Sequence, residues 1–432
     1  MTTREEVLAL VKEYYTSNKK ATPFIPGLTY LQYGGTLYDE KEMISLIDAA
    51  LDFRLTMSRY ADQFEHDLAE FLGMKHCILT NSGSSANLLA LSAITSKKLG
   101  TQRAMPGDEV ITTACGFPTT LNPILQNNLV PVFMDVNLGT YNIKTDNLQD
   151  AVSDRTKAIM IPHTLGNPSD LDTIMQIAED YNLWVIEDNC DALGSKYRGQ
   201  YTGTFGHLST CSFYPPHHIT MGEGGAVLTN HPALKNIVMS FRDWGRDCWC
   251  NPGKDDTCKH RFNQQFGGMP RGYDHKYIYS HIGYNLKATD MQAAIGVEQI
   301  KKLPGFIAAR KRNYKLLRNG LIEYSSYFAL PKETRLSEPS WFGFPLLVKD
   351  EPMRNDIVNY LEDHKVATRM MFGGNLTKQP AYKDMKYCVV GDLKNTDLVM
   401  NNLFWIGVYP GLTEEMIEYI LTTFKKFFAG EP

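Results

Sequence analysis

Four cysteines have a spacing that could support metal chemistry. Cys190, Cys248, Cys250 and Cys258 are separated in turn by 57, one and seven residues. Four thiolates can hold a 2Fe-2S cluster, and an irregular loop can fold back to bring the last three cysteines near Cys190. Zinc is the rival metal, although the cysteine pairs of structural zinc sites are usually separated by about two to four residues. The spacing leaves two interpretations open, a metal or cluster site and ordinary structural cysteines.

A phosphate site is a second candidate, at residues 80–87. The sequence TNSGSSAN follows the strand-like run HCILT and opens a helical run. Gly83 and Ser84 would therefore leave backbone amides free at the N-terminus of a helix, where an anion can bind. An ordinary helix cap explains the same residues. The chain contains neither G-x-x-x-x-G-K-[ST] nor G-x-G-x-x-G, so no nucleoside-triphosphate loop or dinucleotide fingerprint competes for this role.

Two ionisable side chains follow apolar, strand-like runs. Asp188 ends the run LWVIED, and a buried carboxylate needs a donor or a positive partner such as a protonated heterocyclic nitrogen. His217 lies next to His218 on a turn rich in proline and glycine, after the run STCSF. An imidazole with an ordinary pKa of about 6.5 can act as a proton-transfer base. A turn-capping aspartate and surface histidines are the alternative interpretations.

These candidates lie on an alternation of strand-like runs and helical segments. The runs lack strict period-two alternation, which is typical of strands buried on both faces of a largely parallel sheet covered by helices. Such an α/β fold carries its chemistry at the carboxyl ends of the strands. The runs are HCILT, DEVITT, VPVFMD, KAIMIP, LWVIED, STCSF and GAVLT.

Composition excludes several classes of protein. The 432 residues are 43% hydrophobic, 11% aromatic and 21% charged, which is typical of a globular protein with one large core and a satellite unit. A net charge of -4 makes nucleic acid an unexpected partner. The longest uncharged stretch, residues 110–134, contains prolines and asparagines and cannot serve as a bilayer helix, so no membrane partner is expected. The acidic residues of the N-terminal segment do not fit a signal peptide, and we expect a cytoplasmic protein.

The domain organisation follows from the same patterns. We predict an N-terminal helix and arm over residues 1–35, a large domain over residues 36–305, and a small α+β C-terminal domain over residues 306–432. Residues 245–277 form a long segment without periodicity inside the large domain. A loop of this length inside a compact domain is usually functional or disordered.

The order of motifs along the chain resembles the DegT/DnrJ/EryC1/StrS family, the sugar aminotransferases of fold type I that depend on pyridoxal phosphate (PLP). The matching segments are SGSSAN, Glu187-Asp188, SF...GEGG and GYN...TDMQAAIG at residues 283–296, so the resemblance spans nearly the whole chain. It implies the fold-type I aminotransferase fold, with a mostly parallel large domain. It also implies that Gly83, Ser84 and Ser212 bind the coenzyme phosphate, and that Asp188 meets the pyridine nitrogen. Phe117 would stack on the pyridine ring, and Asn285 would reach the phosphate across the interface of a homodimer.

One departure from the family decides the expected function. His217, five residues after Ser212, occupies the position of the lysine that binds the coenzyme covalently, and no lysine occurs between Lys196 and Lys235. Imidazole cannot form a Schiff base with an aldehyde, so the coenzyme would be pyridoxamine 5'-phosphate (PMP), or PLP held noncovalently. Histidine at this position resembles the 3-dehydratases of the family, which act on nucleotide-linked 4-keto-6-deoxyhexoses. His217 would be the base, and Asp191 and Tyr214 the other catalytic residues.

The family resemblance also bears on the cysteines. Some of these 3-dehydratases use no metal, whereas others add a 2Fe-2S cluster and act on CDP-4-keto-6-deoxyglucose in the biosynthesis of 3,6-dideoxysugars such as those of lipopolysaccharide O-antigens. Cys190, Cys248, Cys250 and Cys258 resemble the ligand set of the second kind. The chain has no recognisable flavin or nicotinamide site, so a separate NAD(P)H-dependent reductase with flavin and iron-sulfur centres is implied. Its contact surface should lie near residues 248–277.

Three alternatives remain. The first is a metal-free 3-dehydratase, regenerated by glutamate, in which the cysteines are structural. The second is a sugar aminotransferase that uses a lysine elsewhere in the chain. The third is a redox sensor or electron carrier on a degenerate enzyme scaffold.

Overall fold

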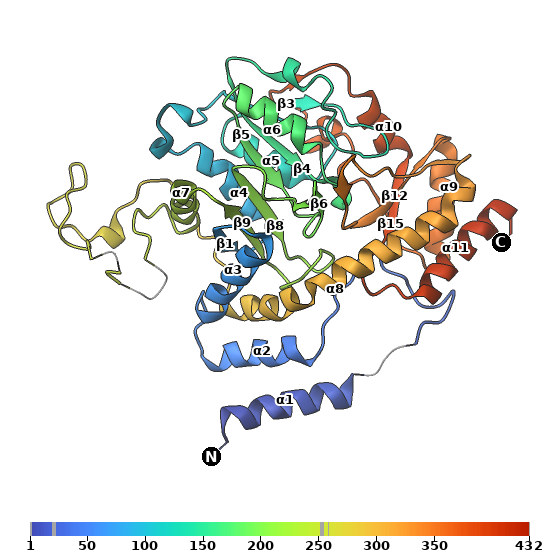
Figure 1. Cartoon of the computed structure of the whole chain (residues 1–432), viewed down its shortest axis with the longest axis horizontal. Helices are drawn as coiled ribbons and strands as arrows, with labels where there is room; N and C mark the ends of the chain where they lie inside the picture. Colours follow the sequence, from blue (N-terminus) through green and yellow to red (C-terminus); the bar gives the residue numbers. More distant parts are fainter. Residues whose placement is uncertain (1, 20–22, 251–254, 258, 432) are drawn as a thin grey trace.

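The computed structural model describes residues 2–19, 23–250, 255–257 and 259–431, and an eight-stranded sheet forms its centre (Figure 1). The strand order is β1-β9-β8-β5-β4-β2-β3-β14. Seven of these strands coincide with the predicted runs. The eighth, β14, comes from the C-terminal part of the chain and was not predicted. The bounds are β1 (His76–Thr80), β2 (Glu109–Thr113), β3 (Val130–Met134), β4 (Thr156–Pro162), β5 (Trp184–Asp188), β8 (Leu208–Ser212), β9 (Gly225–Thr229) and β14 (Cys388–Val389).

The direction of the strands places the predicted site residues at one edge of the sheet. Strand β9 is antiparallel to both of its neighbours, β1 and β8, while the pairs from β8 to β14 are all parallel. The prediction of a mostly parallel sheet is therefore confirmed. Strands β1, β2, β4, β5 and β8 all point the same way, so the segments that follow them meet at the carboxyl edge.

Helices cover both faces of this sheet, as the strand patterns predict. Neighbouring residues of one strand pack into different cores: Ile78 packs with α4 (Gly83–Ile94), α5 (Pro118–Gln126) and α7 (Pro232–Arg242). On the other face, Leu79 packs with α3 (Arg59–Leu72) and α8 (Asp290–Leu321), and α6 (Leu171–Asp180) covers β2 to β5. Burial on both faces explains why these runs are apolar without alternation.

A smaller unit follows along α8 (Figure 1). Its antiparallel sheet has the order β10-β12-β15-β13 and packs on α9, α10 and α11 around its own apolar core. The predicted boundary at residues 305–306 falls within α8, which runs unbroken for 32 residues, so the division into domains stays a prediction. The bounds are β10 (Phe328–Ala329), β12 (Gly343–Val348), α9 (Glu351–Asp363), β13 (Thr368–Met370), α10 (Lys394–Asn402), β15 (Leu403–Gly407) and α11 (Glu414–Ala429).

The remaining elements are peripheral. Helix α1 (Arg4–Asn18) lies outside α2 (Glu40–Leu51), to which Arg4 is bound by ion pairs with Asp48 and Asp52. A three-stranded sheet joins β11 (Ser337–Glu338) to β6 (Lys196–Tyr197) and β7 (Gln200–Tyr201). The described part of residues 243–289 contains no helix or strand beyond a short 3-10 turn at His275–Tyr277, and it extends away from α7 (Figure 1).

Candidate active site

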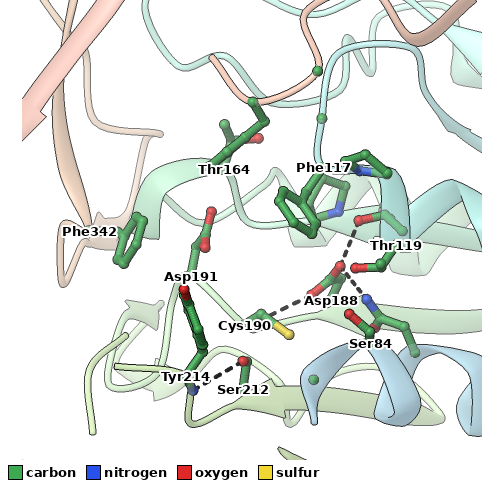
Figure 2. A pocket seen from close by; sticks show the side chains of 18 of the residues that line it. Ser84, Phe117, Thr119, Thr164, Asp188, Cys190, Asp191, Ser212, Tyr214 and Phe342 are labelled. Carbon is green, nitrogen blue, oxygen red and sulfur yellow. Dashed lines mark hydrogen bonds between the residues drawn. The ribbon is translucent and has the colours of Figure 1, made fainter. Parts of the chain in front are cut away.

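A large pocket of about 830 Å³ lies at the carboxyl edge of the central sheet. Its walls come from the ends of β1, β2, β4, β5 and β8, from β13 and β15 of the small sheet, and from the N-terminal arm at Tyr33. Most of the site residues predicted from the sequence line it, and Figure 2 shows several of them around one space. They are Gly83, Ser84, Phe117, Asp188, Cys190, Asp191, Ser212, Tyr214 and His217.

Asp188 is held in place by side chains from two helices. The residue is 6% exposed, and Oδ2 accepts hydrogen bonds from Asn87 Nδ2 at 2.8 Å and Thr120 Oγ1 at 2.6 Å. Oδ1 accepts a longer bond from the Cys190 backbone N–H at 3.3 Å. The carboxylate is thus fixed in orientation while one oxygen can accept from a further donor. A protonated pyridine nitrogen is such a donor.

The N-terminus of α4 forms an anion cradle next to the end of β8. A Cβ added at Gly83 would lie 2.4 Å from Ser212 Cβ and 3.1 Å from Cys190 Sγ, so only glycine allows this approach. The helix is capped by Ser82, whose hydroxyl accepts from the Ser85 backbone N–H at 3.1 Å. The first amides of α4 and the Ser212 hydroxyl therefore share one small space, which suits a phosphate group.

His217 is neutral and can act as a base. Its Nδ1 lies 2.7 Å from the Cys190 carbonyl oxygen. A carbonyl can only accept, so Nδ1 carries the proton and Nε2 carries the lone pair. Burial, together with the positive charge of Arg310, lowers the pKa of His217 to about 4. The Phe342 ring lies against the imidazole, with 5.2 Å between the ring centroids.

Arg310 fixes the backbone of the turn that carries this histidine. The guanidinium is fully buried on α8 and donates to the carbonyls of Pro216 at 3.3 Å and His217 at 3.1 Å. It also donates to the Trp341 carbonyl at 3.2 Å. The neighbouring His218 faces away from the pocket, with Nε2 at 2.7 Å from the Ser340 carbonyl. The two adjacent histidines therefore have different roles, one in the pocket and one in the core.

Asp191 and Tyr214 add two further proton-carrying groups to the pocket wall. Burial and the nearby charge of Asp188 raise the pKa of Asp191 to about 7. Tyr214 is 47% exposed, and its ring centroid lies 6.4 Å from that of His217. Both residues thus lie on the wall that carries the candidate base.

The three described cysteines of the predicted cluster lie in two pockets. Cys190 lines the large pocket, whereas Cys248 and Cys250 line a separate small one with Arg261 and His275. Within the described residues, these three cysteines do not form a group whose sulfurs all lie within 4.8 Å of one another. Cys258 lies outside the described residues.

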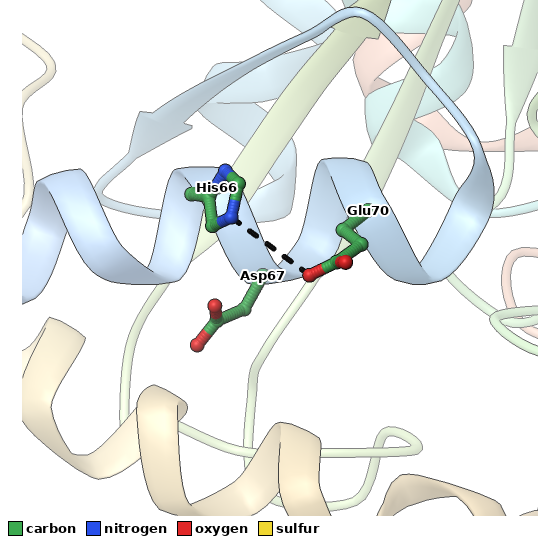
Figure 3. A group of neighbouring side chains, drawn as sticks. All are labelled: His66, Asp67 and Glu70. Carbon is green, nitrogen blue, oxygen red and sulfur yellow. Dashed lines mark ion pairs between the residues drawn. The ribbon is translucent and has the colours of Figure 1, made fainter.

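One other group of potential metal ligands lies on the surface of α3. His66, Asp67 and Glu70 offer ligand atoms within 4.8 Å of one another (Figure 3). His66 Nε2 and Glu70 Oε2 are 3.8 Å apart, and both side chains are mostly exposed. This is an ordinary ion pair one helical turn apart.

Asn285 does not line the pocket of its own chain. It is exposed and accepts a hydrogen bond from Lys287 Nζ. Its contact with the coenzyme phosphate across a subunit interface stays a prediction.

Several pocket residues were not found from the sequence. Asn87 and Thr120 hold Asp188 from positions 101 and 68 residues away, and no local pattern links them. Another part of the wall comes from Tyr33, Phe342, Arg369 and Trp405. These residues are apolar or singly charged members of ordinary strand and loop sequences. Only the packing of the small sheet against the large one shows that they share a pocket.

Comparisons with known proteins agree with this geometry. The profile of the DegT/DnrJ/EryC1/StrS aminotransferase family matches residues 38–425. The lipopolysaccharide biosynthesis protein RfbH of Salmonella typhimurium is 52% identical over 427 residues, which cover 98% of both chains. The dTDP-4-dehydro-2,6-dideoxy-D-glucose 3-dehydratase of Saccharopolyspora spinosa is 50% identical over 428 residues, covering 99% of this chain and 92% of that one.

A solved structure shows the same fold. The Escherichia coli GDP-4-keto-6-deoxy-D-mannose-3-dehydratase with bound hydrated PLP superposes with a TM-score of 0.82 at 28% identity, covering 91% of this chain and 99% of that one. The fold is that of the PLP-dependent aminotransferases. Within the described residues, no helix combines the length and apolar character needed to span a bilayer.

Proposed function

The chain belongs to the DegT/DnrJ/EryC1/StrS aminotransferase family, and within it we propose that the protein is a PMP-dependent 3-dehydratase of nucleotide-linked 4-keto-6-deoxyhexoses. The observation that carries this proposal is the neutral imidazole of His217 beside the coenzyme-binding residues. Among the described residues that line the pocket there is no lysine. A transaminase needs a lysine amine there, whereas a dehydratase needs a base. The names of two relatives, one at 50% and one at 33% identity, also point to 3-dehydration.

The pocket fits the coenzyme. The first amides of α4 and Ser212 would hold the phosphate, Asp188 the protonated pyridine nitrogen, and Phe117 the face of the ring. When bound, PMP supplies a primary amine and an electron-accepting ring, the chemistry by which a hydroxyl next to a ketone can be eliminated.

The chain itself supplies orientation and proton transfer. Hydrogen bonds from Asn87 and Thr120 keep the Asp188 carboxylate in one orientation, so its charge is directed at the pyridine nitrogen. The bond from His217 Nδ1 to the Cys190 carbonyl leaves Nε2 as the atom that takes up a proton. Asp191 and Tyr214 would hold protons for the departing hydroxyl and for the oxygen atoms of the coenzyme and sugar.

The test is product analysis with the PMP-loaded protein. CDP-, GDP- and dTDP-linked 4-keto-6-deoxyhexoses are each incubated with it, and loss of the C3 hydroxyl is followed by mass spectrometry. We expect loss of the C3 hydroxyl from at least one of them, and a fall of about 100- to 10,000-fold in His217→Asn, the usual contribution of a general base. His66→Asn, on the surface of α3, is the matched control. Normal turnover by His217→Asn, or borohydride trapping of PLP onto a lysine, would contradict the assignment.

We further propose that the protein uses a 2Fe-2S cluster bound by Cys190, Cys248, Cys250 and Cys258. A flavin and iron-sulfur reductase would supply the electrons by docking near residues 248–277, and the substrate would be CDP-4-keto-6-deoxyglucose. The spacing of the cysteines and the resemblance support this proposal. The structure places the described cysteines in two pockets, Cys190 in one and Cys248 and Cys250 in the other.

Anaerobic iron and sulfide analysis tests the cluster. We expect about two irons and two labile sulfides per chain in the anaerobically purified protein, as a 2Fe-2S centre requires. Cys250→Ser should lose them, whereas Cys388→Ser, a cysteine in β14, should keep them. An iron-free protein that still removes the C3 hydroxyl when glutamate regenerates the coenzyme would establish the metal-free alternative. A cluster without PMP binding would instead indicate a redox carrier.

A further inference from the structure

The charges on the pocket wall are unevenly distributed. Asp188 and Asp191 carry acidic groups, and Arg369 is the one residue with a permanent positive charge among the described residues that line the pocket. A nucleotide-linked sugar brings a diphosphate with about two negative charges. Binding such a substrate beside these acidic groups requires a cation near the diphosphate.

Arg369 is held in a defined position on the small sheet. It lies on β13 directly opposite Trp405 on β15. Its guanidinium carbon lies 4.1 Å from the centroid of the Tyr33 ring, and Nη1 donates to the Thr368 carbonyl at 2.7 Å. Tyr33 in turn packs edge-on against Trp405, with centroids 5.4 Å apart. An aromatic stack therefore orients an otherwise exposed side chain.

The positive charge of Arg369 is not neutralised by an acid. Within the described residues, no carboxylate oxygen lies within 4.0 Å of its side-chain nitrogens. The nearby Glu362 already accepts from the Tyr30 hydroxyl at 2.9 Å, the Thr368 backbone N–H at 2.6 Å and the Thr368 hydroxyl at 2.8 Å. A guanidinium has five N–H donors, and the Thr368 carbonyl accepts one of those of Arg369, so other donors can meet a ligand.

The other cations near the pocket cannot take this role. Arg310 is fully buried, does not line the pocket and donates from Nη1 and Nη2 to backbone carbonyls. His217 is neutral, and its Nδ1 proton is bound to the Cys190 carbonyl. Among the described residues, Arg369 alone combines a fixed charge, unused donors and access to the pocket.

We propose that Arg369, stacked on Tyr33, binds the diphosphate of the nucleotide-linked sugar and so determines that the substrate carries a nucleoside diphosphate. This inference rests on the proposed function. The sugar would then lie between Arg369, contributed by the small sheet, and the coenzyme-binding residues of the large sheet. Guanidinium groups suit this task because their planar donors match two phosphate oxygens at once.

Calorimetric titration of the PMP-loaded protein tests the proposal. CDP, GDP, dTDP and their parent nucleosides are titrated into the wild type, Arg369→Gln, Arg369→Lys and Lys383→Gln. Lys383 is exposed and does not line the pocket, so this control removes one positive charge elsewhere on the C-terminal part. PMP absorbance confirms that each variant is folded and loaded.

We expect Arg369→Gln to weaken the tightest-binding nucleoside diphosphate by about 10- to 100-fold, the usual range for charge-assisted hydrogen bonds. Arg369→Lys should recover part of the loss, and binding of the parent nucleoside should not change. Lys383→Gln should bind like the wild type.

The outcomes separate this inference from the proposed function. Equal binding by Arg369→Gln and the wild type, equal losses for nucleoside and diphosphate, or no binding of any nucleoside diphosphate would overturn the inference. If Arg369 controls diphosphate binding but no ketosugar loses its C3 hydroxyl, the dehydratase assignment fails while the inference stands. If a ketosugar loses its C3 hydroxyl but diphosphate binding does not depend on Arg369, the dehydratase assignment stands and the inference about Arg369 fails.

Discussion

The coenzyme wall of the pocket and the segment of residues 243–289 organise their functional groups in opposite ways. On the wall, Asp188 ends β5 and His217 lies on the turn after β8, and each is fixed by hydrogen bonds of 2.6–2.8 Å to neighbouring groups. In the segment, large apolar side chains face solvent, among them Phe262 at 61% and Ile282 at 96% exposure. The comparison teaches that packed strands fix their functional side chains through short hydrogen bonds, whereas the described part of an aperiodic segment leaves large apolar side chains exposed.

The segment is nevertheless anchored at a few points. His281 links the Ser96 hydroxyl at 2.6 Å to the Ser240 hydroxyl at 2.8 Å, and Asp247 pairs with Lys98. Leu286 and Ala288 pack against the apolar cores. The described residues before them are attached to α7 and its neighbours by polar contacts, and several of their large apolar side chains are exposed. Low burial of this kind is typical of regions with low local stability.

The largest expected contrast comes from the same substitution made in each region. Phe213 is fully buried against Phe64, with 5.1 Å between the ring centroids, whereas Phe262 is largely exposed. Phe213→Ala should lower the free energy of unfolding by about 3–5 kcal/mol because it leaves a cavity. Phe262→Ala should change it by less than about 0.5 kcal/mol. Chemical denaturation measures both, and similar values for the two variants would contradict the comparison.

Replacing the buried carboxylate should weaken coenzyme binding. Asp188→Asn removes the negative charge that faces the pyridine nitrogen, and we expect the Kd for PMP to rise by at least about 10-fold. The change is followed by PMP absorbance or by quenching of protein fluorescence. Asp172→Asn, at an exposed ion pair with Arg198, is the control and should bind PMP normally. Unchanged PMP binding by Asp188→Asn would remove Asp188 from the coenzyme site.

Loss of one donor to that carboxylate should have a smaller effect. Thr120→Val keeps the shape of the side chain but removes the 2.6 Å hydrogen bond to Asp188. We expect a loss of about 1–3 kcal/mol in the free energy of unfolding of the coenzyme-free protein, since a buried acceptor then lacks one of its donors. Excess PMP should restore part of it. No loss on denaturation would show that Asn87 alone suffices.

The smallest effect is expected for His281, which anchors the segment of residues 243–289. Protonation of its imidazole should make the stability of the protein depend on pH. Burial lowers the pKa of His281 to about 4, whereas an unfolded histidine has a pKa of about 6.5. The unfolded chain therefore binds more protons between these values, and the contribution of His281 to stability is lost as the pH falls from about 6.5 to 4. His281→Gln should show a shallower decrease in Tm over this range than the wild type. His66→Gln, on the exposed face of α3, should keep the wild-type slope; equal slopes for all three proteins would exclude His281.

Local sequence predicted the strands of the large sheet because each is a short apolar run flanked by helical segments. Helix α8 is one helix of 32 residues that continues through Pro304. A proline inside a helix costs about 3 kcal/mol, and burial of α8 against α2 and α3 offsets this cost. Strand β14, of two residues, is too short to give a pattern and is defined by its pairing with β3.

The candidate site likewise depends partly on local sequence and partly on tertiary packing. The sequence by itself determined which chemical groups follow the strands, because the carboxyl ends of parallel strands necessarily meet at one edge of a sheet. Only the tertiary structure decided that Asn87 and Thr120 hold Asp188, that Arg369 stacks on Tyr33, and that Cys190 lies in a different pocket from Cys248 and Cys250. Contacts between residues so far apart in the chain depend on how helices and sheets pack. No local sequence pattern links the polar residues that this packing brings together.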